Sequence, residues 1–254
     1  MLGVRRFFSL KFESGICSLV GPGKKKGEDA YWASSDLLTV ADGVGGWTLS
    51  GIDPSKYAWE LITNIQKAKN LPQNKTALEI LHSASANCTE TGSSTCVLMV
   101  LDPISGIVDT INVGDSGFYL YRKAENRLEL VNKSQEVLHG FNFPFQLGTE
   151  GDSPNTGNKK KIKVQNEDLI VLYSDGLSDN LFEEKVREML ENAVNKGNGL
   201  EEIAKELANE AIRVSADNSY LSPFAKTASL YYMQRYLGGK PDDTTVIVAK
   251  VCGE

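Results

Sequence analysis

The stretch YWASSDLLTVADGVGGW, residues 31–47, shows the pattern that recurs along this 254-residue chain: an apolar run that ends in an acidic, glycine-rich loop. The part from 31 to 40 predicts a strand, and the glycines of DGVGGW permit a tight turn after it that a β-carbon would obstruct. LIVLYSDG at 169–176 repeats the pattern, and DDTTVIVAKV at 242–251 places two acids before a last strand. The sequence therefore predicts acidic loops at several strand ends.

Two helices are predicted after the first of these loops, over residues 53–70 and 76–87. The first opens with an aspartate followed by proline, which is typical of an N-cap and the first helical position. The second opens with a Thr-x-x-Glu capping box. The two helices are expected to form a hairpin.

From residue 94 the pattern changes to consecutive antiparallel strands, each bounded by Gly, Pro, Asp or Asn. These runs cover residues 94–102, 106–123 and 127–132. Residues 140–160 lack periodicity and predict a surface loop. Later helical stretches are predicted near residues 182–195, 199–216 and 223–236. Neither an internal repeat nor an interdomain linker occurs, so one domain is predicted over residues 1–254.

The amino-acid composition argues against several classes of function. Acidic residues outnumber basic ones by 33 to 27, giving a formal net charge of −6, so nucleic acid is not an expected partner. The longest apolar runs are far shorter than the roughly 20 residues that cross a bilayer, and no transmembrane segment is expected. The four cysteines form no CxxC pair and are expected to be reduced and mostly buried thiols. The sequence carries no signal for an oligomeric state.

The first twelve residues, MLGVRRFFSLKF, contain three basic side chains and no acid. This composition resembles the start of a mitochondrial presequence. The alternation of Phe8, Leu10 and Phe12 equally predicts an ordinary first strand. At the level of the sequence both alternatives stay open.

Acidic residues gather at the predicted strand ends. They are Glu28, Asp29, Asp42, Asp115, Asp175, Asp242 and Asp243. Any one of them alone is typical of a turn. If several meet at one end of a sheet, however, their mutual repulsion requires cations. Oxygen ligands and a chain with only two histidines favour Mg²⁺ or Mn²⁺ over zinc or copper. Two such ions about 4 Å apart can deprotonate a water and hold a phosphate for in-line attack.

Other hydrolytic chemistries lack their motifs in this sequence. No cysteine is followed by a phosphate-binding loop with an arginine, and no GxxxxGK[ST] loop is present. No GxSxG nucleophile elbow accompanies His82 or His139. The motifs therefore favour a metal-dependent reaction.

Six short motifs, in this order, resemble those of the protein phosphatase 2C family. They are GEDA at 27–30, DGVGGW at 42–47, GSST at 92–95, GDSG at 114–117, SDGLSDN at 174–180 and GGKPDDTTV at 238–246. FNFPFQL at 141–147 and YLSPFA at 220–225 resemble the short mitochondrial branch that includes the phosphatase 2C homolog 7 proteins. The resemblance implies an α+β fold, a four-layer α/β/β/α sandwich of two central antiparallel β-sheets flanked by helices, with a dinuclear metal site at one end.

The same resemblance assigns residues to that site. The implied metal ligands are Glu28, Asp42, Gly43, Asp175 and Asp242, of which Asp42, Asp175 and Asp242 are also the expected catalytic residues. Asp42 would bridge both ions, and Gly43 would offer its carbonyl oxygen. Asp29 would orient these ligands. Asp115 and Asp179 match positions that hold a third, weaker metal in some relatives, although Asp115 alternatively orders the GDSG turn.

Two positions depart from the family pattern. Many members carry an arginine before the acidic pair to grip the substrate phosphate, where this chain has a lysine run at 24–26. Lys24 is the candidate phosphate contact, and the run is alternatively a solvated surface. Many relatives also have a histidine at the position of Val44 that would protonate the leaving alkoxide, so slow turnover is expected.

The expected function is a protein serine/threonine phosphatase that uses two Mg²⁺ or Mn²⁺ ions and takes a phosphoprotein as its partner. The alternative is a catalytically weak or inactive binding module with the phosphatase fold. Replacement of Asp42, Asp175 or Asp242 would signal that alternative, and none of them is replaced. The mitochondrion is the expected location, with the plastid or the cytosol as alternatives.

Overall fold

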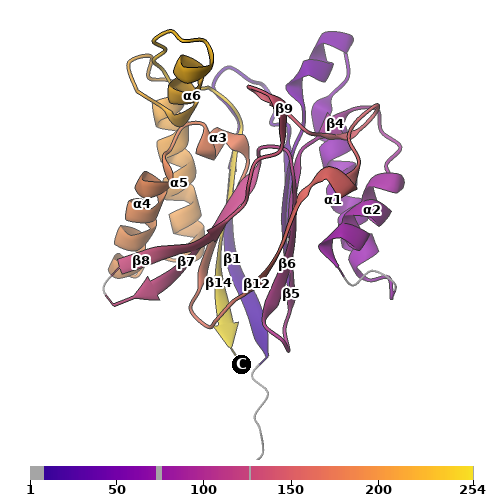
Figure 1. Cartoon of the computed structure of the whole chain (residues 1–254), viewed down its shortest axis with the longest axis vertical. Helices are drawn as coiled ribbons and strands as arrows, with labels where there is room; N and C mark the ends of the chain where they lie inside the picture. The colour runs from indigo at the N-terminus through magenta and orange to yellow at the C-terminus, as the bar shows by residue number, and fades with distance from the viewer. Residues whose placement is uncertain (1–8, 73–75, 126, 254) are drawn as a thin grey trace, which may run out of the picture.

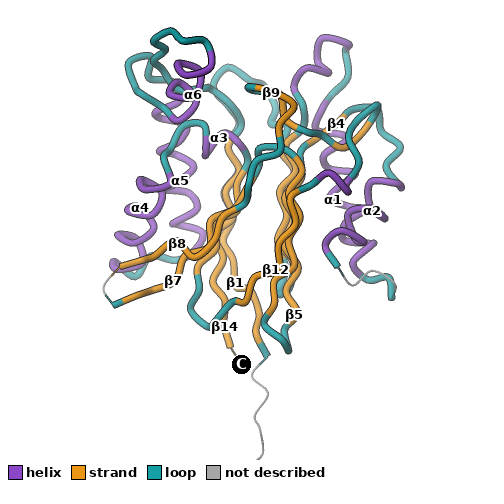
Figure 2. The backbone as a smooth tube through the Cα atoms, viewed as in Figure 1, coloured by secondary structure: helices purple, strands orange, loops and turns teal. Residues whose placement is uncertain are grey.

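The computed structural model describes residues 9–72, 76–125 and 127–253, which form two five-stranded β-sheets packed face to face with helices outside (Figures 1 and 2). Neighbouring strands in both sheets are antiparallel. The predicted four-layer α/β/β/α sandwich is confirmed. No helix in these described ranges is both long and apolar enough to span a membrane.

The two sheets draw their strands from distant parts of the chain. The first has the order β1 (Leu10–Leu19), β14 (Thr244–Gly253), β13 (Leu169–Tyr173), β7 (Gly117–Ala124) and β8 (Arg127–Lys133). The second has the order β12 (Asn158–Lys163), β6 (Ile107–Val113), β5 (Cys96–Asp102), β3 (Leu37–Asp42) and β2 (Asp29–Ala33). Two further pairs of short strands join β4 (Ser93–Ser94) to β11 (Leu147–Gly148) and β9 (Leu138–Gly140) to β10 (Phe143–Pro144).

Helices cover the outer faces of both sheets. On the second sheet lie α1 (Pro54–Lys69) and α2 (Ala77–Ala86), and on the first lie α4 (Glu183–Lys196) and α5 (Leu200–Ser215) (Figure 1). The other helical segments are α3 (Asp175–Ser178), α6 (Pro223–Tyr231), η1 (Gly45–Ser50) and η2 (Pro154–Thr156). The aspartate N-cap of α1 and the capping box of α2 both form, so these two predicted helices are confirmed.

The burial of β13 explains why its run LIVLY is apolar throughout. Ile170 and Leu172 pack into the core between the sheets, whereas Val171 and Tyr173 pack into the core beneath α4 and α5. A strand that is buried on both faces has no polar face to show in the sequence. Phe12 joins the core between the sheets, so the predicted first strand exists from Leu10 onward, while Phe8 and the rest of residues 1–8 lie outside the described residues.

Three predicted elements were wrong. The single strand predicted over residues 31–40 is the hairpin of β2 and β3, because Ser34 turns the chain by donating from its backbone N–H to the Leu37 carbonyl at 2.8 Å. The predicted loop over 140–160 includes the start of β12, an edge strand whose side chains are largely exposed apart from Ile162. Helix α6 ends at Tyr231 and not near residue 236.

Antiparallel pairing brings the acidic loops to one end of the sandwich. Strands β3 and β13 end there, and β2, β7 and β14 begin there, because Asp29 pairs with Asp42 while Tyr173 pairs with both Gly117 and Val246. The GDSG turn crosses at this end from β6 of the second sheet to β7 of the first. Residues far apart in the sequence therefore meet in one place.

Candidate functional site

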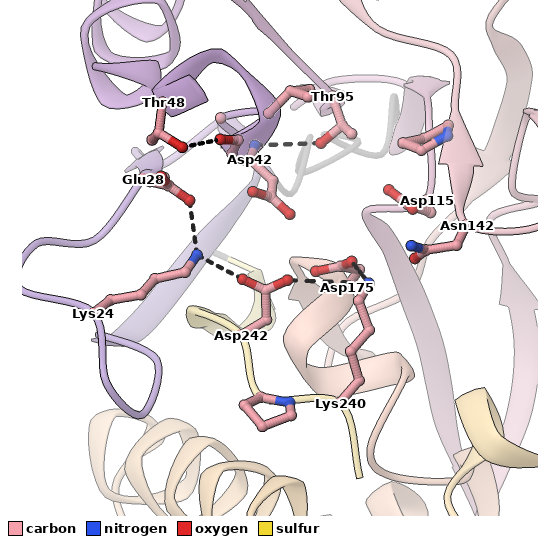
Figure 3. Close-up of a pocket in the computed structure, with 15 residues that line it drawn as sticks. Lys24, Glu28, Asp42, Thr48, Thr95, Asp115, Asn142, Asp175, Lys240 and Asp242 are labelled. Atoms are coloured by element: carbon pink, nitrogen blue, oxygen red, sulfur yellow. Dashed lines mark hydrogen bonds and ion pairs between the residues drawn. The ribbon is translucent and has the colours of Figure 1, made fainter. Parts of the chain in front are cut away.

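A cavity of about 510 Å³ opens at the end of the sandwich where the acidic loops meet. Figure 3 shows that carboxylates from both sheets surround it. All the residues that the resemblance assigned to the dinuclear site line this cavity, namely Glu28, Asp42, Gly43, Asp175 and Asp242. Lys24, Val44, Asp115 and Lys240 line it as well. The structure therefore brings the predicted ligands together.

Asp29 and Asp179 lie beside the cavity and do not line it. Asp29 is buried, and its Oδ2 accepts a hydrogen bond from Ser174 Oγ at 2.8 Å, which links the start of β2 to the end of β13. Asp179 borders a neighbouring cavity of about 100 Å³ together with Asp115 and Glu136. Asp115 lines both cavities and so lies between the two groups of acids.

The GSST and GDSG motifs hold Asp42 in position. The Asp42 N–H donates to Thr95 Oγ1 at 3.2 Å, and the Asp42 carbonyl accepts from the Thr95 N–H at 2.9 Å. Thr95 Oγ1 is in turn hydrogen-bonded to Ser116 Oγ at 2.7 Å. The loop after Asp42 is fixed by Trp47, whose indole N–H donates to Ser93 Oγ at 2.6 Å. These two motifs thus orient a carboxylate of the site.

Two glycines allow the acidic loops to approach each other. A β-carbon at Gly43 would lie 2.8 Å from the carbonyl oxygens of both Glu28 and Pro54. A β-carbon at Gly176 would lie 2.0 Å from the carbonyl oxygen of Asp243. Because these neighbours are backbone atoms, which cannot move aside as the end of a flexible side chain can, only glycine fits directly after the two predicted ligands in DG.

The Lys24 ammonium lies among three carboxylates. Its Nζ is 2.7 Å from Glu28 Oε2, 2.7 Å from Asp242 Oδ1 and 3.0 Å from Asp243 Oδ2. Burial lowers the pKa of Lys24, but these hydrogen-bonded carboxylates outweigh burial and raise it above its ordinary value. The candidate phosphate contact is thus a cation that ties the first acidic loop to the last.

Asp243 positions the loop that carries Glu28, a role that the sequence did not reveal. Its Oδ1 accepts from the Gly21 N–H at 2.7 Å, and its Oδ2 accepts from the Glu28 N–H at 2.8 Å. The residue is only 2% exposed. The DD pair was visible in the sequence, but the partners of its second member belong to a segment more than two hundred residues away.

Lys240 is a residue of the site that the sequence reasoning missed. Its Nζ lies 2.5 Å from Asp175 Oδ2 and 2.6 Å from Asp179 Oδ2. Burial lowers the pKa of Lys240, but the charges of the two aspartates outweigh burial and raise it well above its ordinary value. The signal in the sequence was a lysine two positions before Asp242 in GGKPDDTTV.

Crowding shifts the carboxylate pKa values in two directions. Burial raises the pKa of Asp42 well above its ordinary value, and the charges of Asp29 and Asp175 raise it further. Burial and the charge of Asp175 also raise the pKa of Asp242. Asp175 is different, because the nearby Lys240 ammonium outweighs burial and lowers its pKa. The site in this structure therefore combines an ionised aspartate with aspartates that hold protons more readily.

The oxygen atoms of the site suit a hard cation. Asp175 Oδ1 is buried without a hydrogen-bond partner among the described residues. A buried oxygen without a partner is costly, and a cation would satisfy it. Within the described part of the chain, no three His, Cys, Asp or Glu side chains already have the spacing of metal ligands. Asp242 and Asp175 pair instead with the ammonium groups of Lys24 and Lys240.

Comparison with known proteins places this site in a family. Residues 37–251 match the family model described as Stage II sporulation protein E (SpoIIE). The chain is 36% identical over 251 residues to the probable protein phosphatase 2C BIPP2C1 of Oryza sativa subsp. japonica, covering 96% of this chain and 43% of that protein. It is 34% identical over 267 residues to the protein phosphatase PTC7 homolog of Homo sapiens, covering 96% of this chain and 84% of that protein. The chain thus spans less than half the length of the rice relative.

Solved structures share the fold. The X-ray structure of the photosystem II phosphatase PBCP has a TM-score of 0.85 at 28% identity and covers 94% of this chain and 98% of that chain. The catalytic domain of the serine/threonine phosphatase PstP, solved in complex with 2 manganese ions, has a TM-score of 0.67 at 19% identity and covers 96% of this chain and 100% of that chain. Because the family match spans most of the chain and relatives exceed 30% identity over nearly all of it, the chain belongs to the protein phosphatase 2C family.

Proposed function

We propose that this chain is a metal-dependent protein serine/threonine phosphatase that hydrolyses phosphoserine and phosphothreonine and uses two Mg²⁺ or Mn²⁺ ions. The observation that carries the proposal is the meeting of Glu28, Asp42, Asp175 and Asp242 in one cavity. Relatives named as protein phosphatases support the activity, and a structural neighbour that holds manganese supports the choice of metal.

The donors around the cavity fit two divalent cations. The carboxylates and the Gly43 carbonyl offer only oxygen atoms, which are the ligands that hard ions prefer. In this proposal Glu28, Asp42, Gly43, Asp175 and Asp242, which all line the cavity, would together hold the two ions. When bound, such a pair supplies an activated water for attack on phosphorus and neutralises the charge of the phosphate.

Lys24 and Val44 line the cavity wall, where they would face the substrate. Lys24 now pairs with carboxylates, and once cations neutralise those carboxylates its side chain, which is 32% exposed, is free to contact the phosphate. An ammonium supplies charge to that phosphate without the bidentate geometry of an arginine. Val44 lines the cavity and carries no proton donor, so no side chain at this position protonates the leaving oxygen. We therefore expect slow turnover for the family.

Hydrolysis of phosphoserine and phosphothreonine peptides tests the proposal. With Mn²⁺ or Mg²⁺ we expect turnover that EDTA abolishes. Asp42→Asn should lower kcat by more than about 100-fold, since removing even an outer partner of a metal ligand costs 10–100-fold. The matched control is Asp102→Asn, a carboxylate that ends β5 at the opposite end of the sandwich and should leave kcat unchanged.

Two results would overturn this function. Metal-independent turnover, or full activity of Asp42→Asn, would exclude a carboxylate-held metal pair as the catalyst. Binding of phosphopeptide without any hydrolysis in the presence of Mn²⁺ would favour the alternative of a binding module with the phosphatase fold.

We also propose a mitochondrial location. Its support is the basic, acid-free composition of residues 1–12 and the similarity to proteins named PTC7 homologs. The test is a fluorescent reporter fused behind the N-terminal residues of this chain and imaged beside a mitochondrial dye. A reporter that stays in the cytosol or enters plastids would contradict the proposal.

A further inference from the structure

Lys240 places a positive charge where the family resemblance implied a third metal ion. That ion was assigned to Asp115 and Asp179, close to Asp175. In the structure the Lys240 Nζ lies 2.5 Å from Asp175 Oδ2, 2.6 Å from Asp179 Oδ2 and 4.0 Å from Asp242 Oδ2. Figure 3 shows the Lys240 side chain extending from the loop before β14 to the Asp175 carboxylate.

The backbone of Lys240 is fixed by Asn180, a fully buried residue at the end of the SDGLSDN motif. The Lys240 N–H donates to Asn180 Oδ1 at 2.8 Å, and Asn180 Nδ2 donates to the Lys240 carbonyl at 2.8 Å. Asn180 Nδ2 also donates to the Gly176 carbonyl at 2.9 Å, which ties the lysine to the segment that carries Asp175. The Phe224 ring lies 5.4 Å from the Lys240 Nζ. These contacts aim the ammonium at the two aspartates.

Lys24, the other ammonium of the cavity, is held differently. It belongs to a glycine- and lysine-rich loop, and the backbone hydrogen bond of its N–H is to Gly21 of the same loop at 3.1 Å. Its side chain is 32% exposed, against 18% for Lys240. Lys24 can therefore leave its carboxylates more easily than Lys240 can.

A third divalent ion held by Asp115 and Asp179 would compete with the Lys240 ammonium for the Asp179 carboxylate. Mg²⁺ requires nearly octahedral oxygen ligands at about 2.0–2.1 Å. Asp175 Oδ2 and Asp179 Oδ2 already accept hydrogen bonds from Nζ, so an ion at these atoms would lie against a buried ammonium of the same sign. As long as Lys240 stays in place, the residues do not fit a third ion.

From this disagreement we infer that the Lys240 ammonium replaces the third cation and that the site takes two divalent ions. The inference rests on the proposed two-ion phosphatase function. Lys240 is then a positioning residue that acts through Asp175. It binds Asp175 Oδ2 and leaves the buried Asp175 Oδ1, which has no partner among the described residues, for one of the two ions.

The number of Mn²⁺ ions bound per chain tests the inference. We would measure it on the purified full chain by isothermal titration calorimetry and by the EPR signal of free Mn²⁺. The wild type should saturate at two ions even at millimolar Mn²⁺. Lys240→Met, which keeps most of the length of the side chain and removes its charge, should bind a third ion, and Lys240→Arg should return to two. Three ions on the wild type, or only two on a folded Lys240→Met, would overturn the inference.

Lys24→Met is the matched control, because it removes the other ammonium of the same cavity. It should still bind two ions, since Lys24 lies beside Glu28 and Asp242 and not between Asp175 and Asp179. A third ion on Lys24→Met would show that any loss of positive charge creates a metal site, and that result would also contradict the inference.

A second variant covers the case in which Lys240→Met does not fold, because it leaves buried carboxylates without their cation. Asp179→Asn keeps Lys240 and its bond to Asp175. If Lys240 and not a metal uses Asp179, this variant should bind the same two ions as the wild type with unchanged affinities. Loss of one ion in Asp179→Asn would show that Asp179 holds a metal and would refute the inference.

The ion count separates this inference from the proposed function. A wild type that binds two ions and hydrolyses no phosphopeptide would refute the phosphatase activity and leave the role of Lys240 standing. An active wild type with three bound ions would do the opposite.

Discussion

Asp42 and Asp175 line the same cavity, yet their pKa values move in opposite directions. Burial raises both values, but only Asp175 has an ammonium within 2.5 Å, whereas the charges that act most strongly on Asp42 are other carboxylates. In the metal-free protein Asp42 is therefore the carboxyl group that more readily holds a proton. Cation binding must displace that proton, so metal affinity should rise with pH.

A substitution at Val44 tests whether the lack of a general acid at this position limits the rate. Val44→His would place an imidazole in the cavity wall, where it could protonate the leaving oxygen. General acids typically contribute about 10²–10⁴-fold to a rate. We therefore expect kcat on a phosphopeptide to rise, with a new loss of activity at high pH as the histidine loses its proton.

The control for this prediction is Val44→Gln, which adds a polar side chain without a titrating group. A rise in kcat for both variants would show that the wild-type rate is limited by the apolar side chain of Val44 and not by the lack of a proton donor. Unchanged kcat in a folded Val44→His would contradict the account of slow turnover.

The residues of the site differ in how far the sequence could predict them. Glu28, Asp42, Asp175 and Asp242 stand in motifs whose local pattern and order point to them, and the structure gathers them in one cavity. Lys240 could not be singled out in this way. Its role depends on Asn180, Asp175 and Asp179, which meet it only through tertiary structure.

At the scale of elements, local signals predicted the helices better than the strands. Both α1 and α2 begin at capping residues, which act within a few positions of the helix they start. Strand limits depend on distant partners. The pattern over 106–123 was predicted as consecutive strands but divides between two sheets, and β12 alternates exposed lysines so that only its pairing with β6 reveals a strand.

The contribution of the α1 N-cap to the stability of the protein can be measured. Asp53 Oδ1 accepts from the Ser55 N–H at 3.1 Å, and its Oδ2 accepts from Lys26 Nζ at 2.7 Å. Asp53→Ala removes both contacts and should lower the free energy of unfolding by about 1 kcal/mol, the typical cost of losing such a cap. Urea denaturation at neutral pH measures the difference.

Asp53→Asn is the companion variant, because asparagine caps a helix about as well as aspartate does. It should lose only the contribution of the exposed Lys26 pair, which is small for surface ion pairs. If Asp53→Asn and Asp53→Ala were equally destabilised, the charge and not the cap would be the main contribution of this residue.

At the scale of the whole molecule, the fold places several carboxylates at one end of the sandwich, and their repulsion opposes folding. Burial between the sheets is what holds them there, because the strands that carry them pair and pack along their whole length. The apolar core therefore stabilises an arrangement that the acids alone would not adopt. The prediction of one domain over residues 1–254 stays a prediction.

This arrangement predicts how the stability of the metal-free protein depends on pH. Burial is the main cause that raises the pKa of Asp29 and of Asp179 to about 7. A carboxyl group whose pKa is higher in the folded than in the unfolded state gives its full stabilisation below the unfolded value, near 4. That stabilisation is lost as the pH rises through the folded value. The lowered pKa of Asp175 acts only below its ordinary value, outside the range from about pH 5 to 8.

In EDTA, the melting temperature should therefore fall as the pH rises from about 5 to 8, and differential scanning calorimetry measures it. Mn²⁺ should raise the melting temperature most at the high end of this range, because the ions then neutralise carboxylates that have lost their protons. Asp29→Asn, which cannot ionise, should flatten part of the decline in EDTA. If the melting temperature in EDTA stayed constant or rose with pH, ionisation of the buried acids would not destabilise the folded protein, which would contradict this prediction.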